Sequence, residues 1–522
     1  MVSDQNPPSR ASISGLAPGL GRTFVKDRHR NTLALAAICL SALMLGLEIS
    51  SIPAILPTLE RVLGADFRQL QWIMNAYTVA MTTCLMAMGT LADRFGRRRV
   101  FLLGVTAFGV ASLLCGLAPG APLLIAARFL QGASGAAMLA CQTAVLSHQF
   151  RDGAARGMAF GWWGIVFGSG LGFGPLIGGV TVAVLNWDWV FLVHVGLALV
   201  TLALGRAGIA ESADPQALHI DRAGIATLSL AVFSLVYLIT RGQPLRVDDP
   251  VSLLALAGAA SAIAFVAVEL RAARPMFDVA AFRNRRFSGA LLGSAAMNAS
   301  FWPFVIYLPI YVQAVLGYDS VAAGFALLAY TLPTLAVPPL AERLLLRYGP
   351  GLVIPLGLFT IGAGFLLMRL AATGAGADWL TLLPGAVLAG TGLGLTNTPV
   401  TNTATGAVPA ERAGMASGMD MSARMITLAV NIALMGFLLL QGVRADLGRV
   451  LPAEAAGSLD ALAEAVAAGN LPADGIGPSL ARQALASGFA GVMLYGGLGA
   501  WLFAGLSRLV FGRPGAAGRG PA

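Results

Sequence analysis

Long apolar segments recur along almost the whole chain and are separated by short polar connections. A helix needs about 20 apolar residues to cross the hydrocarbon core of a bilayer, and the segments have about this length. The pattern therefore predicts an all-α polytopic membrane protein with fourteen transmembrane helices, at about residues 33–57, 71–91, 100–117, 122–146, 158–184, 188–205, 223–240, 251–270, 288–316, 321–341, 351–371, 379–404, 414–441 and 485–510.

One connection between the predicted spans is much longer than the others. Residues 442–484 are rich in Ala, Gly and acidic residues, and we expect them to lie outside the membrane. Within this connection, we expect one short amphipathic helix at Leu459–Ala468.

The composition agrees with a membrane protein. Hydrophobic residues make up 57% of the chain and charged residues 11%, whereas soluble domains carry about 25% charged residues. So few charges cannot cover a water-facing surface, which argues against a soluble enzyme, a disordered chain and a nucleic-acid-binding protein. The four cysteines lie inside apolar segments without C-x-x-C spacing, so we expect neither a disulfide nor a metal site.

The distribution of positive charge predicts the orientation in the membrane. If the N-terminus lies inside, the inside segments carry about three times as many Lys and Arg residues as the outside segments. Cytoplasmic loops carry such an excess. The net charge of +9 therefore reflects topology, and we expect both termini in the cytoplasm.

The connection between the second and third predicted spans holds the most informative motif, Gly89-Thr90-Leu91-Ala92-Asp93-Arg94-Phe95-Gly96-Arg97-Arg98-Arg99. Physically, Gly89 lets another helix approach, Asp93 can pair with a helix dipole or an arginine, and Gly96 allows a tight turn. The run resembles the signature of the major facilitator superfamily at the same place. The resemblance implies a role in conformational gating for Gly89, Asp93, Arg94, Gly96, Arg97 and Arg98.

Three further stretches resemble motifs of this superfamily. The fourth span contains Arg128-Phe129-Leu130-Gln131-Gly132, and the second opens with Gln71-Trp72-Ile73-Met74-Asn75-Ala76-Tyr77. The fifth span matches the antiporter motif G-x-x-x-G-P-x-x-G-G, which is typical of exporters. A helix of this kind, kinked by Gly and Pro, packs tightly against a partner and blocks a leak. The matching residues are Gly170, Gly174, Pro175, Gly178 and Gly179.

With fourteen predicted spans, the chain resembles the fourteen-span drug/proton antiporter branch of the superfamily. This resemblance implies a major facilitator fold of two six-helix bundles with an inserted helix pair. The expected parts are a cytoplasmic tail over 1–31, an N-terminal bundle over 32–206, the inserted helices and a cytoplasmic linker over 207–286, a C-terminal bundle over 287–510, which includes the extracytoplasmic loop 442–484, and a cytoplasmic tail over 511–522.

Ionisable side chains inside a membrane are costly and point to function. Glu48 and Asp420 are the acidic residues well inside predicted spans. Glu48 matches in part a first-helix motif of the fourteen-span antiporters, which implies proton coupling at Glu48 near Arg128; the alternative is a carboxylate permanently paired with Arg128. Asp420 and Arg424 lie four residues apart on one helix face, either as a self-compensating ion pair or as a second proton or cation site.

The predicted substrate cavity combines aromatic and polar side chains at membrane depth. Such a cavity, with one acidic residue, suits a hydrophobic or cationic drug-like compound, although each aromatic side chain alone is also compatible with ordinary packing. His194, where the family more often has Asn, is expected to be a buried core residue. The residues assigned to the cavity are Trp72, Asn75, Tyr77, Gln131, Asn298, Trp302, Tyr307 and Arg424.

Together these features predict a secondary active transporter and not an enzyme. The chain has no P-loop or hydrolase motif, so we expect no cofactor and an ion gradient as the energy source. The expected function is proton-coupled antiport by alternating access, exporting drug-like compounds across the inner (cytoplasmic) membrane. A dedicated exporter of an endogenous metabolite, siderophore or natural product is the main alternative, and a non-transporting receptor or membrane enzyme is the remote one.

The expected partners follow from this function. They are a small-molecule substrate, protons and the lipid bilayer, with no nucleic acid. The resemblance also allows a periplasmic adaptor and an outer-membrane channel. Nothing in the sequence indicates stable oligomerisation, so we expect a monomer.

Overall fold

The computed structural model of the protein describes residues 18–150, 153–213, 221–241, 250–271, 279–374, 378–408, 413–450, 459–470 and 477–512. In these parts of the chain, the regular secondary structure is entirely helical. Residues 1–17 of the predicted N-terminal tail and residues 513–522 of the predicted C-terminal tail lie outside the described residues.

Eight long helices occupy the first half of the chain. Six of them correspond to the predicted N-terminal bundle, and two lie in the predicted insertion. They are α1 (Pro18–Leu63), α2 (Phe67–Phe95), α3 (Arg97–Gly116), α4 (Ala121–Gln149), α5 (Gly153–Val184), α6 (Trp189–Gly208), α7 (Arg222–Arg241) and α8 (Pro250–Arg271).

The second half of the chain contains more broken helices, because several prolines and a π-turn interrupt it. Its elements are η1 (Val279–Arg283), α9 (Arg285–Ala299), α10 (Phe301–Ile310), η2 (Tyr311–Val315), α11 (Ser320–Thr331), α12 (Pro333–Ala336), α13 (Pro338–Tyr348), α14 (Pro350–Thr373), α15 (Trp379–Gly406), α16 (Ala413–Val450), α17 (Leu459–Ala468) and α18 (Pro478–Phe511).

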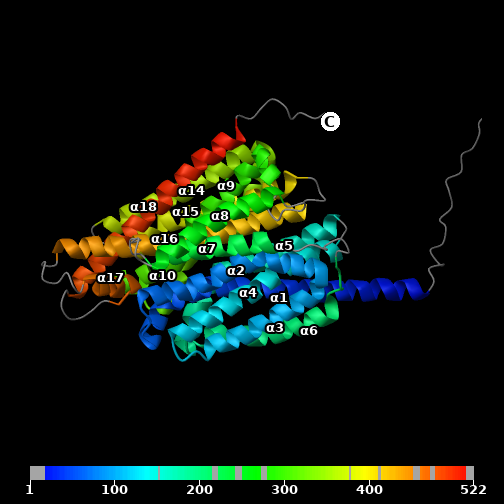
Figure 1. The fold of residues 1–522 in the computed structure, drawn as a ribbon, viewed down its shortest axis with the longest axis horizontal. Helices are drawn as coiled ribbons and strands as arrows, with labels where there is room; N and C mark the ends of the chain where they lie inside the picture. Colours follow the sequence, from blue (N-terminus) through cyan, green and yellow to red (C-terminus); the bar gives the residue numbers. More distant parts are fainter. Residues whose placement is uncertain are drawn as a thin grey trace, which may run out of the picture.

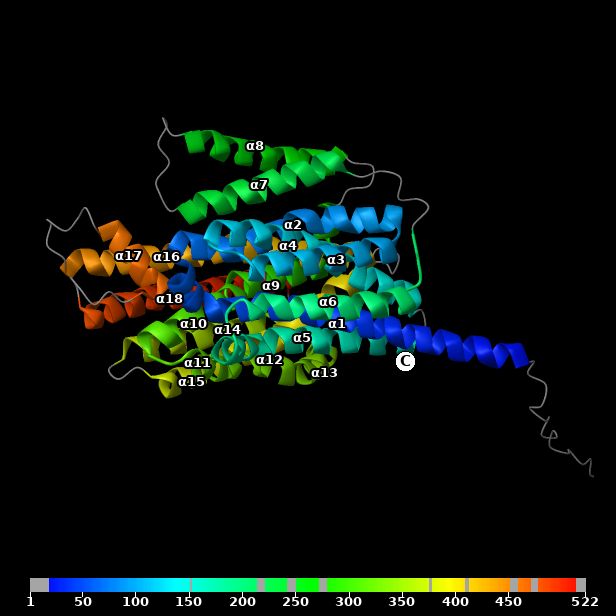
Figure 2. The same ribbon diagram turned by 90° about the horizontal axis from the view of Figure 1, so that it is seen from below.

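The helices run roughly side by side along the long axis of the molecule (Figure 1). In the N-terminal half, α1 packs on α5 and α6, and α4 packs on α2 and α3. In the C-terminal half, α14 packs on α15 and α18, and α18 also packs on α9 and α16. Figure 2 shows α7 and α8 as a separate pair beside α2, and α7 contacts both α2 and α16. The inserted pair therefore touches both halves of the protein.

Local sequence explains the boundaries of the second helix. Asp66 caps the start of α2, because its carboxylate accepts a hydrogen bond from the backbone N–H of Gln69 and the Gln69 side chain accepts one from the backbone N–H of Asp66. At the other end, Gly96 has φ +108°, a conformation that favours glycine. The tight turn expected at Gly96 is therefore present between α2 and α3.

The number of candidate membrane spans is lower than the fourteen expected. Twelve helices in the described residues are long and apolar enough to cross a membrane, or thirteen if Ser320–Ala336 and Pro338–Tyr348, bent by 42°, form one span. The helix that falls short is α2, since its buried face carries polar side chains such as Gln71, Asn75 and Thr82. The structure thus shows a polytopic all-helical protein with about twelve apolar helices.

Several helices extend beyond the predicted spans. Helix α1 begins at Pro18, inside the segment predicted as a polar tail, and α16 continues to Val450, into the predicted loop. Helix α18 begins at Pro478, before the predicted start of the last span at residue 485. The short helix predicted within the loop is confirmed, because α17 covers Leu459–Ala468.

Candidate functional site

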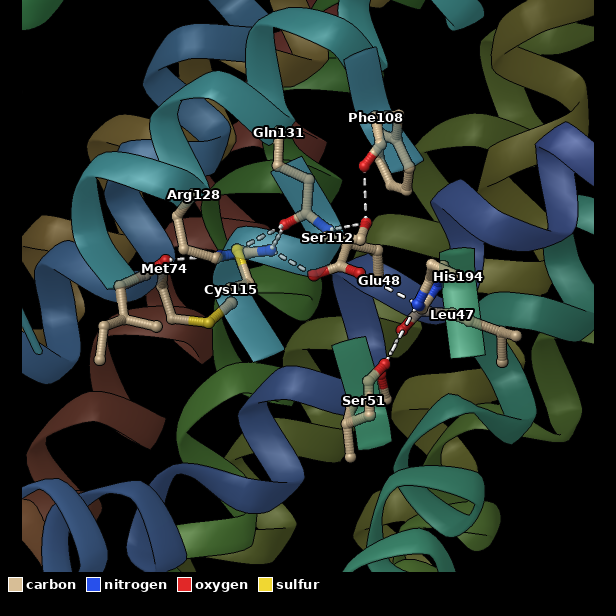
Figure 3. Close-up of polar contacts among 12 residues, drawn as sticks. Leu47, Glu48, Ser51, Met74, Phe108, Ser112, Cys115, Arg128, Gln131 and His194 are labelled. Carbon is tan, nitrogen blue, oxygen red and sulfur yellow. Dashed lines mark hydrogen bonds and ion pairs between the residues drawn. The ribbon is translucent and has the colours of Figure 1, made fainter. Parts of the chain in front are cut away.

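A buried ion pair joins α1 and α4 near the centre of the N-terminal half (Figure 3). The side chains of Glu48 and Arg128 are both 0% exposed, and Nη1 of Arg128 donates to Oε1 of Glu48. Nη1 also donates to Oε1 of Gln131 at 2.7 Å, and Nε donates to the carbonyl oxygen of Ile73 at 2.9 Å. Removing either charge would leave the other buried and unpaired, at a cost of about 3–5 kcal/mol.

Neutral side chains extend the cluster around this ion pair. Nε2 of Gln131 donates to Oγ of Ser112 at 2.9 Å, which ties α4 to α3. The Arg128 guanidinium lies over the Tyr77 ring, 4.4 Å from its centroid, a position that favours a cation–π interaction. The guanidinium is therefore held by α1, α2 and its own helix at once.

His194 lies on the other side of the Glu48 carboxylate. Its Nδ1 is 3.5 Å from Oε2 of Glu48 and 3.1 Å from the carbonyl oxygen of Val190, and its Nε2 is 3.2 Å from the carbonyl oxygen of Met44. The ring is 1% exposed and packs edge-on against Phe108. The burial expected for His194 is confirmed, but its contact with Glu48 was not predicted.

A small pocket lies next to the ion pair, between the two halves of the protein. The N-terminal half contributes residues of α1, α2 and α4, and the C-terminal half contributes residues of α10 and α16. The lining residues are Ile49, Ser50, Met74, Tyr77, Thr78, Arg128, Trp302, Val305, Ile306 and Leu428. The wall is mostly apolar, with Arg128 as its charged member.

Two polar groups of the pocket residues are left without partners. Nη2 of Arg128 and the hydroxyl of Tyr77 are buried and have no hydrogen-bond partner among the described residues. Unsatisfied buried donors are costly. Within the described residues, these two groups are thus polar positions that the closed packing around the ion pair does not satisfy.

The structure brings only part of the predicted cavity to this pocket. Of the residues predicted for the cavity, Tyr77 and Trp302 line it, next to Arg128 of the predicted coupling site. Trp72 packs instead on Phe233 and Tyr237 of α7, with ring centroids 6.2 and 6.0 Å apart. The Trp72 side chain thus packs between α2 and α7 of the inserted helix pair and does not line the pocket.

The other predicted cavity residues make structural hydrogen bonds away from the pocket wall. Nδ2 of Asn75 donates to Oγ1 of Thr240 at 3.2 Å, which links α2 to α7. Nδ2 of Asn298 donates to its own helix at the carbonyl oxygen of Ser294. The Tyr307 hydroxyl donates to the carbonyl oxygen of Ile432 at 2.6 Å. Gln131 belongs to the ion-pair cluster and Arg424 to a second one, so none of these five lines the pocket.

The pocket residues that sequence analysis missed carry a helical signal. Tyr77 and Thr78 lie three and four residues after Met74, and Val305 and Ile306 lie three and four residues after Trp302. Residues at such spacings share one face of a helix. Their apolar character alone could not distinguish this face from ordinary core, because the facing helix is far away in sequence.

Asp420 and Arg424 form the expected ion pair on α16. Nε of Arg424 is 3.1 Å from Oδ2 of Asp420, and the hydroxyl of Ser294 donates to Oδ1. Nη2 of Arg424 donates to Oγ1 of Thr401 at 3.0 Å. Each carboxylate oxygen of Asp420 has a donor, which fits the self-compensating pair better than an open cation site.

The gating motif lies at the turn between α2 and α3. Nε and Nη2 of Arg97 donate to Oδ1 of Asp93 at 3.0 and 2.9 Å, and the Arg94 guanidinium lies over the Phe95 ring. A Cβ on Gly89 would meet the nearest methyl at 4.0 Å, an ordinary contact. In this conformation the space beside Gly89 would therefore accommodate a methyl group.

Glu211 completes the motif and was not predicted from the sequence. Its Oε1 accepts a hydrogen bond from the backbone N–H of Arg98 at 3.1 Å, and Oε2 lies 3.7 Å from Nε of Arg99. A carboxylate at the N-terminus of a helix is favourable. Glu211 follows α6, so it ties the start of α3 to the segment that leads toward the inserted pair. The sequence offered no signal for this contact beyond an acidic residue after a span.

The antiporter motif on α5 presses against α1 beside Glu48. A Cβ on Gly174 would overlap Oγ of Ser50, and one on Gly178 would come within 2.7 Å of the carbonyl oxygen of Ser51. On Gly170, a Cβ would lie 2.9 Å from the carbonyl oxygen of Leu43. These glycines set the distance between α1 and α5.

The rest of the motif reaches the C-terminal half of the protein. A Cβ on Gly179 would lie 2.3 Å from the carbonyl oxygen of Ser320, at the start of α11. Pro175 lies inside α5, and its carbonyl oxygen would lie 3.1 Å from a Cβ on Gly324 of α11. The motif therefore contributes to the contact between the two halves as well.

Several polar contacts between the two halves lie at the end of the molecule that holds α17, and one lies further along α5, where the Thr331 hydroxyl donates to the carbonyl oxygen of Gly172. Nη2 of Arg68 on α2 is 2.6 Å from Oε1 of Glu464 on α17. Nε2 of Gln313 donates to the carbonyl oxygen of Ala54 at 3.0 Å. At the opposite end, Asp93, Arg97, Arg98 and Arg99 of the gating motif make their hydrogen bonds and ion pairs within the described part of the N-terminal half. The described residues thus form a molecule held shut at the α17 end.

Metal-binding clusters are a further class of site. In the parts of the chain that the structure describes, no group of three or more His, Cys, Asp or Glu side chains is arranged to hold a metal ion. Cys39, Cys84, Cys115 and Cys141 are free thiols.

Several known proteins are similar to this chain in sequence or in fold. "Multidrug resistance protein Stp" of Mycobacterium tuberculosis (strain CDC 1551 / Oshkosh) is 31% identical over 416 residues, which cover 80% of this chain and 77% of that protein. "Puromycin resistance protein pur8" of Streptomyces alboniger is 32% identical, covering 78% of this chain and 81% of that one. "Tetracenomycin C resistance and export protein" of Streptomyces glaucescens is 31% identical, covering 86% and 85%.

A solved structure of the nucleoside transporter NupG has a similar fold. It matches with a TM-score of 0.59 at 11% identity, covering 92% of this chain and all of that one. The model of the Major Facilitator Superfamily matches residues 38–431, which is most of the chain. The protein therefore belongs to the Major Facilitator Superfamily and is a multi-pass membrane transporter, not an enzyme.

Proposed function

We propose that the protein is a proton-coupled antiporter that exports hydrophobic or cationic drug-like compounds. The observation that carries this proposal is the buried Glu48–Arg128 ion pair at the wall of a mostly apolar pocket between the halves. The relatives named for multidrug resistance and for antibiotic resistance support drug-like substrates. The fold supports alternating access, in which the halves open the pocket to one side at a time.

The ion pair offers a simple way to couple protons to substrate. With Glu48 ionised, the charge of Arg128 in the pocket wall is neutralised, and a cationic or apolar compound can enter. When the site takes up a proton, it gains a net positive charge next to the pocket. Because charges at such short distances interact strongly at low dielectric, protonation then expels a cationic substrate.

We further propose that the protein spans the inner membrane fourteen times, as in the fourteen-span drug/proton antiporter branch. Helix α2 is long enough to cross, and its polar side chains face the interior rather than lipid. With the bent α11–α13 segment as one span, α2 brings the count to fourteen. The arginine-rich turn before α3 is then cytoplasmic, as are both termini, and α17 lies outside.

In this orientation the structure has its outer side closed. We propose that Asp93 and the arginines Arg97, Arg98 and Arg99 latch the cytoplasmic side in the opposite, outward-open state. Their hydrogen bonds and ion pairs among the described residues support this, because these contacts lie within the N-terminal half. Reconstitution of this chain alone tests the expected periplasmic adaptor and outer-membrane channel, because transport by the chain alone would show that neither is required.

The test uses everted membrane vesicles with an acidic lumen, loaded with a pH-sensitive dye. Adding tetraphenylphosphonium or another lipophilic cation should release protons from vesicles that contain the wild-type protein. The Glu48→Gln variant should lose this release, because the side chain keeps its shape but cannot ionise.

Asp460→Asn is the matched control, because this exposed side chain pairs with Arg444 at the surface. It should behave as wild type. Proton-coupled efflux that persists unchanged in Glu48→Gln would refute the coupling role of Glu48.

A dedicated natural-product exporter is the second candidate function. The relative named for tetracenomycin C resistance and export favours it, since that match covers 86% of this chain. The same vesicles separate the two: a response to one natural product and to no lipophilic cation would favour the dedicated exporter.

A further inference from the structure

We infer that His194 is a second proton-binding residue of the coupling site and that its ring is cationic in this conformation, with Glu48 as its counter-charge. This inference deepens the proposed proton-coupled transport and rests on it. It concerns which atom carries the proton.

Both ring nitrogens of His194 face hydrogen-bond acceptors. Nδ1 lies 3.1 Å from the carbonyl oxygen of Val190, and Nε2 lies 3.2 Å from the carbonyl oxygen of Met44. A neutral imidazole donates from one nitrogen only, whereas the imidazolium donates from both. In the neutral form, one nitrogen lone pair would therefore point at a carbonyl oxygen inside a fully buried site.

In the described part of the chain, one oxygen of the Glu48 carboxylate has no hydrogen-bond donor and can accept a hydrogen bond from the cationic ring. Arg128 holds Oε1, while Oε2 has no hydrogen-bond donor among the described residues. Nδ1 of His194 is the cationic partner of Oε2, at 3.5 Å (Figure 3). A short shift of the ring would make this contact a hydrogen bond.

The other ionisable groups near the ring do not replace Glu48. Helices α1, α3 and α5 pack on α6. Helix α1 contributes Glu48, and α3 contributes the Cys115 thiol, which contacts Gln131 rather than the ring. No ion pair links His194 to the described residues of α5. Arg128 binds the other oxygen of the Glu48 carboxylate, and Tyr77 packs against the Arg128 guanidinium.

Proton uptake on His194 avoids a penalty that uptake on Glu48 alone would carry. If Glu48 took the proton and kept it, the buried charge of Arg128 would lose its counter-charge. If Nδ1 of His194 holds the proton, the Glu48–Arg128 pair stays intact and the site still gains one positive charge. Transfer from Nδ1 to Oε2 converts imidazolium and carboxylate into imidazole and carboxylic acid, which gives the proton a route between the two residues.

The first test reads the protonation of the ring directly. The chain has four histidines, so replacing His29, His148 and His219 by Gln leaves one ¹⁵N-labelled ring for NMR. In membranes at neutral pH, where a free histidine is mostly neutral, we expect the imidazolium signals. Glu48→Gln should lower the ratio of cationic to neutral ring about tenfold or more, because an adjacent opposite charge shifts such equilibria by that amount.

Glu60→Gln, on the same helix and distant from the ring, is the control and should leave the ratio unchanged. A ring that is neutral in the wild type at neutral pH, or a ratio that is equal in Glu48→Gln, would overturn the inference. The NMR measurement of ring protonation does not require the protein to transport a substrate. A cationic ring in a protein without proton-coupled efflux would refute the proposed function alone.

The second test uses His194→Asn in the vesicle assay. Asparagine keeps a polar donor and acceptor in place but cannot take up a proton. We expect tetraphenylphosphonium binding at alkaline pH to stay at the wild-type level, while proton release per transported cation falls. A merely structural His194 would lower both together or neither, and either result would count against a proton-binding role.

Discussion

Glu48, Arg128 and His194 form one buried cluster in which each side chain depends on the others. Glu48 alone would be an isolated charge in low dielectric, and Arg128 makes its ionised form tolerable. The guanidinium does more than supply charge, because it bonds Glu48, Gln131 and a backbone carbonyl oxygen from fixed directions. Its planar shape lets one side chain satisfy three acceptors.

Replacing Arg128 by Lys tests this geometry while keeping the charge. A lysine ammonium cannot reproduce the fork, so at least one buried acceptor loses its donor, at a cost of about 1–3 kcal/mol each. We expect a lower melting temperature in detergent and strongly reduced efflux of tetraphenylphosphonium. Wild-type stability and efflux in Arg128→Lys would show that charge alone suffices at this position.

At the level of elements, α5 acts as a spacer for α1. Gly174 and Gly178 bring the α5 backbone against Ser50 and Ser51, directly after Glu48 on α1. In membranes, helices associate largely through such close packing of small residues. The position of the Glu48 backbone relative to α4 and α6 is thus partly set from the opposite side by α5.

Gly178→Ala should loosen this interface. The added methyl would lie 2.7 Å from the carbonyl oxygen of Ser51, and such overpacking costs about 1–3 kcal/mol. We expect a lower melting temperature and weaker coupling between proton release and efflux.

Gly164→Ala is the matched control on the same helix, because nothing lies within 4 Å of its added methyl. It should be neutral or slightly stabilising, since alanine favours helix by about 1 kcal/mol over glycine. Equal effects of the two variants would contradict the spacer role of α5.

For the whole molecule, the end at which the two halves are in contact determines the side to which the pocket is closed. Contacts between the halves at the α17 end include Arg68–Glu464, Gln313–Ala54 and Gln71–Tyr307. Alternating access requires these contacts to break when the pocket opens to that side. The inserted helix α7, which touches α2 and α16, must accommodate the same movement.

Cysteines at Arg68 and Glu464 should trap the closed state. In a variant without the four native cysteines, Arg68→Cys with Glu464→Cys and a short thiol-reactive cross-linker should stop efflux, because the side chains of the native pair meet at 2.6 Å. Adding a reductant that cleaves the linker should restore transport. Full activity in the cross-linked protein would show that this end does not open during the cycle.

Much of the fold followed from local patterns in the chain. The apolar segments correspond to long helices, and Leu459–Ala468 forms the predicted short helix, because membrane spans and amphipathic helices depend on composition over about one helix length. The Asp420–Arg424 pair was also predictable, since its partners lie one turn apart on α16. The resemblance to the superfamily was visible in the sequence because its motifs are contiguous there.

The make-up of the site was decided by tertiary structure. Trp72 and Asn75 read as cavity residues, yet they face α7, because the sequence does not say where the inserted pair docks. His194 meets Glu48 across 146 positions of the chain, and Glu211 reaches the start of α3 from beyond α6. The sequence determines which side chains are costly to bury, whereas only the packing of distant helices determines which partners make that burial possible.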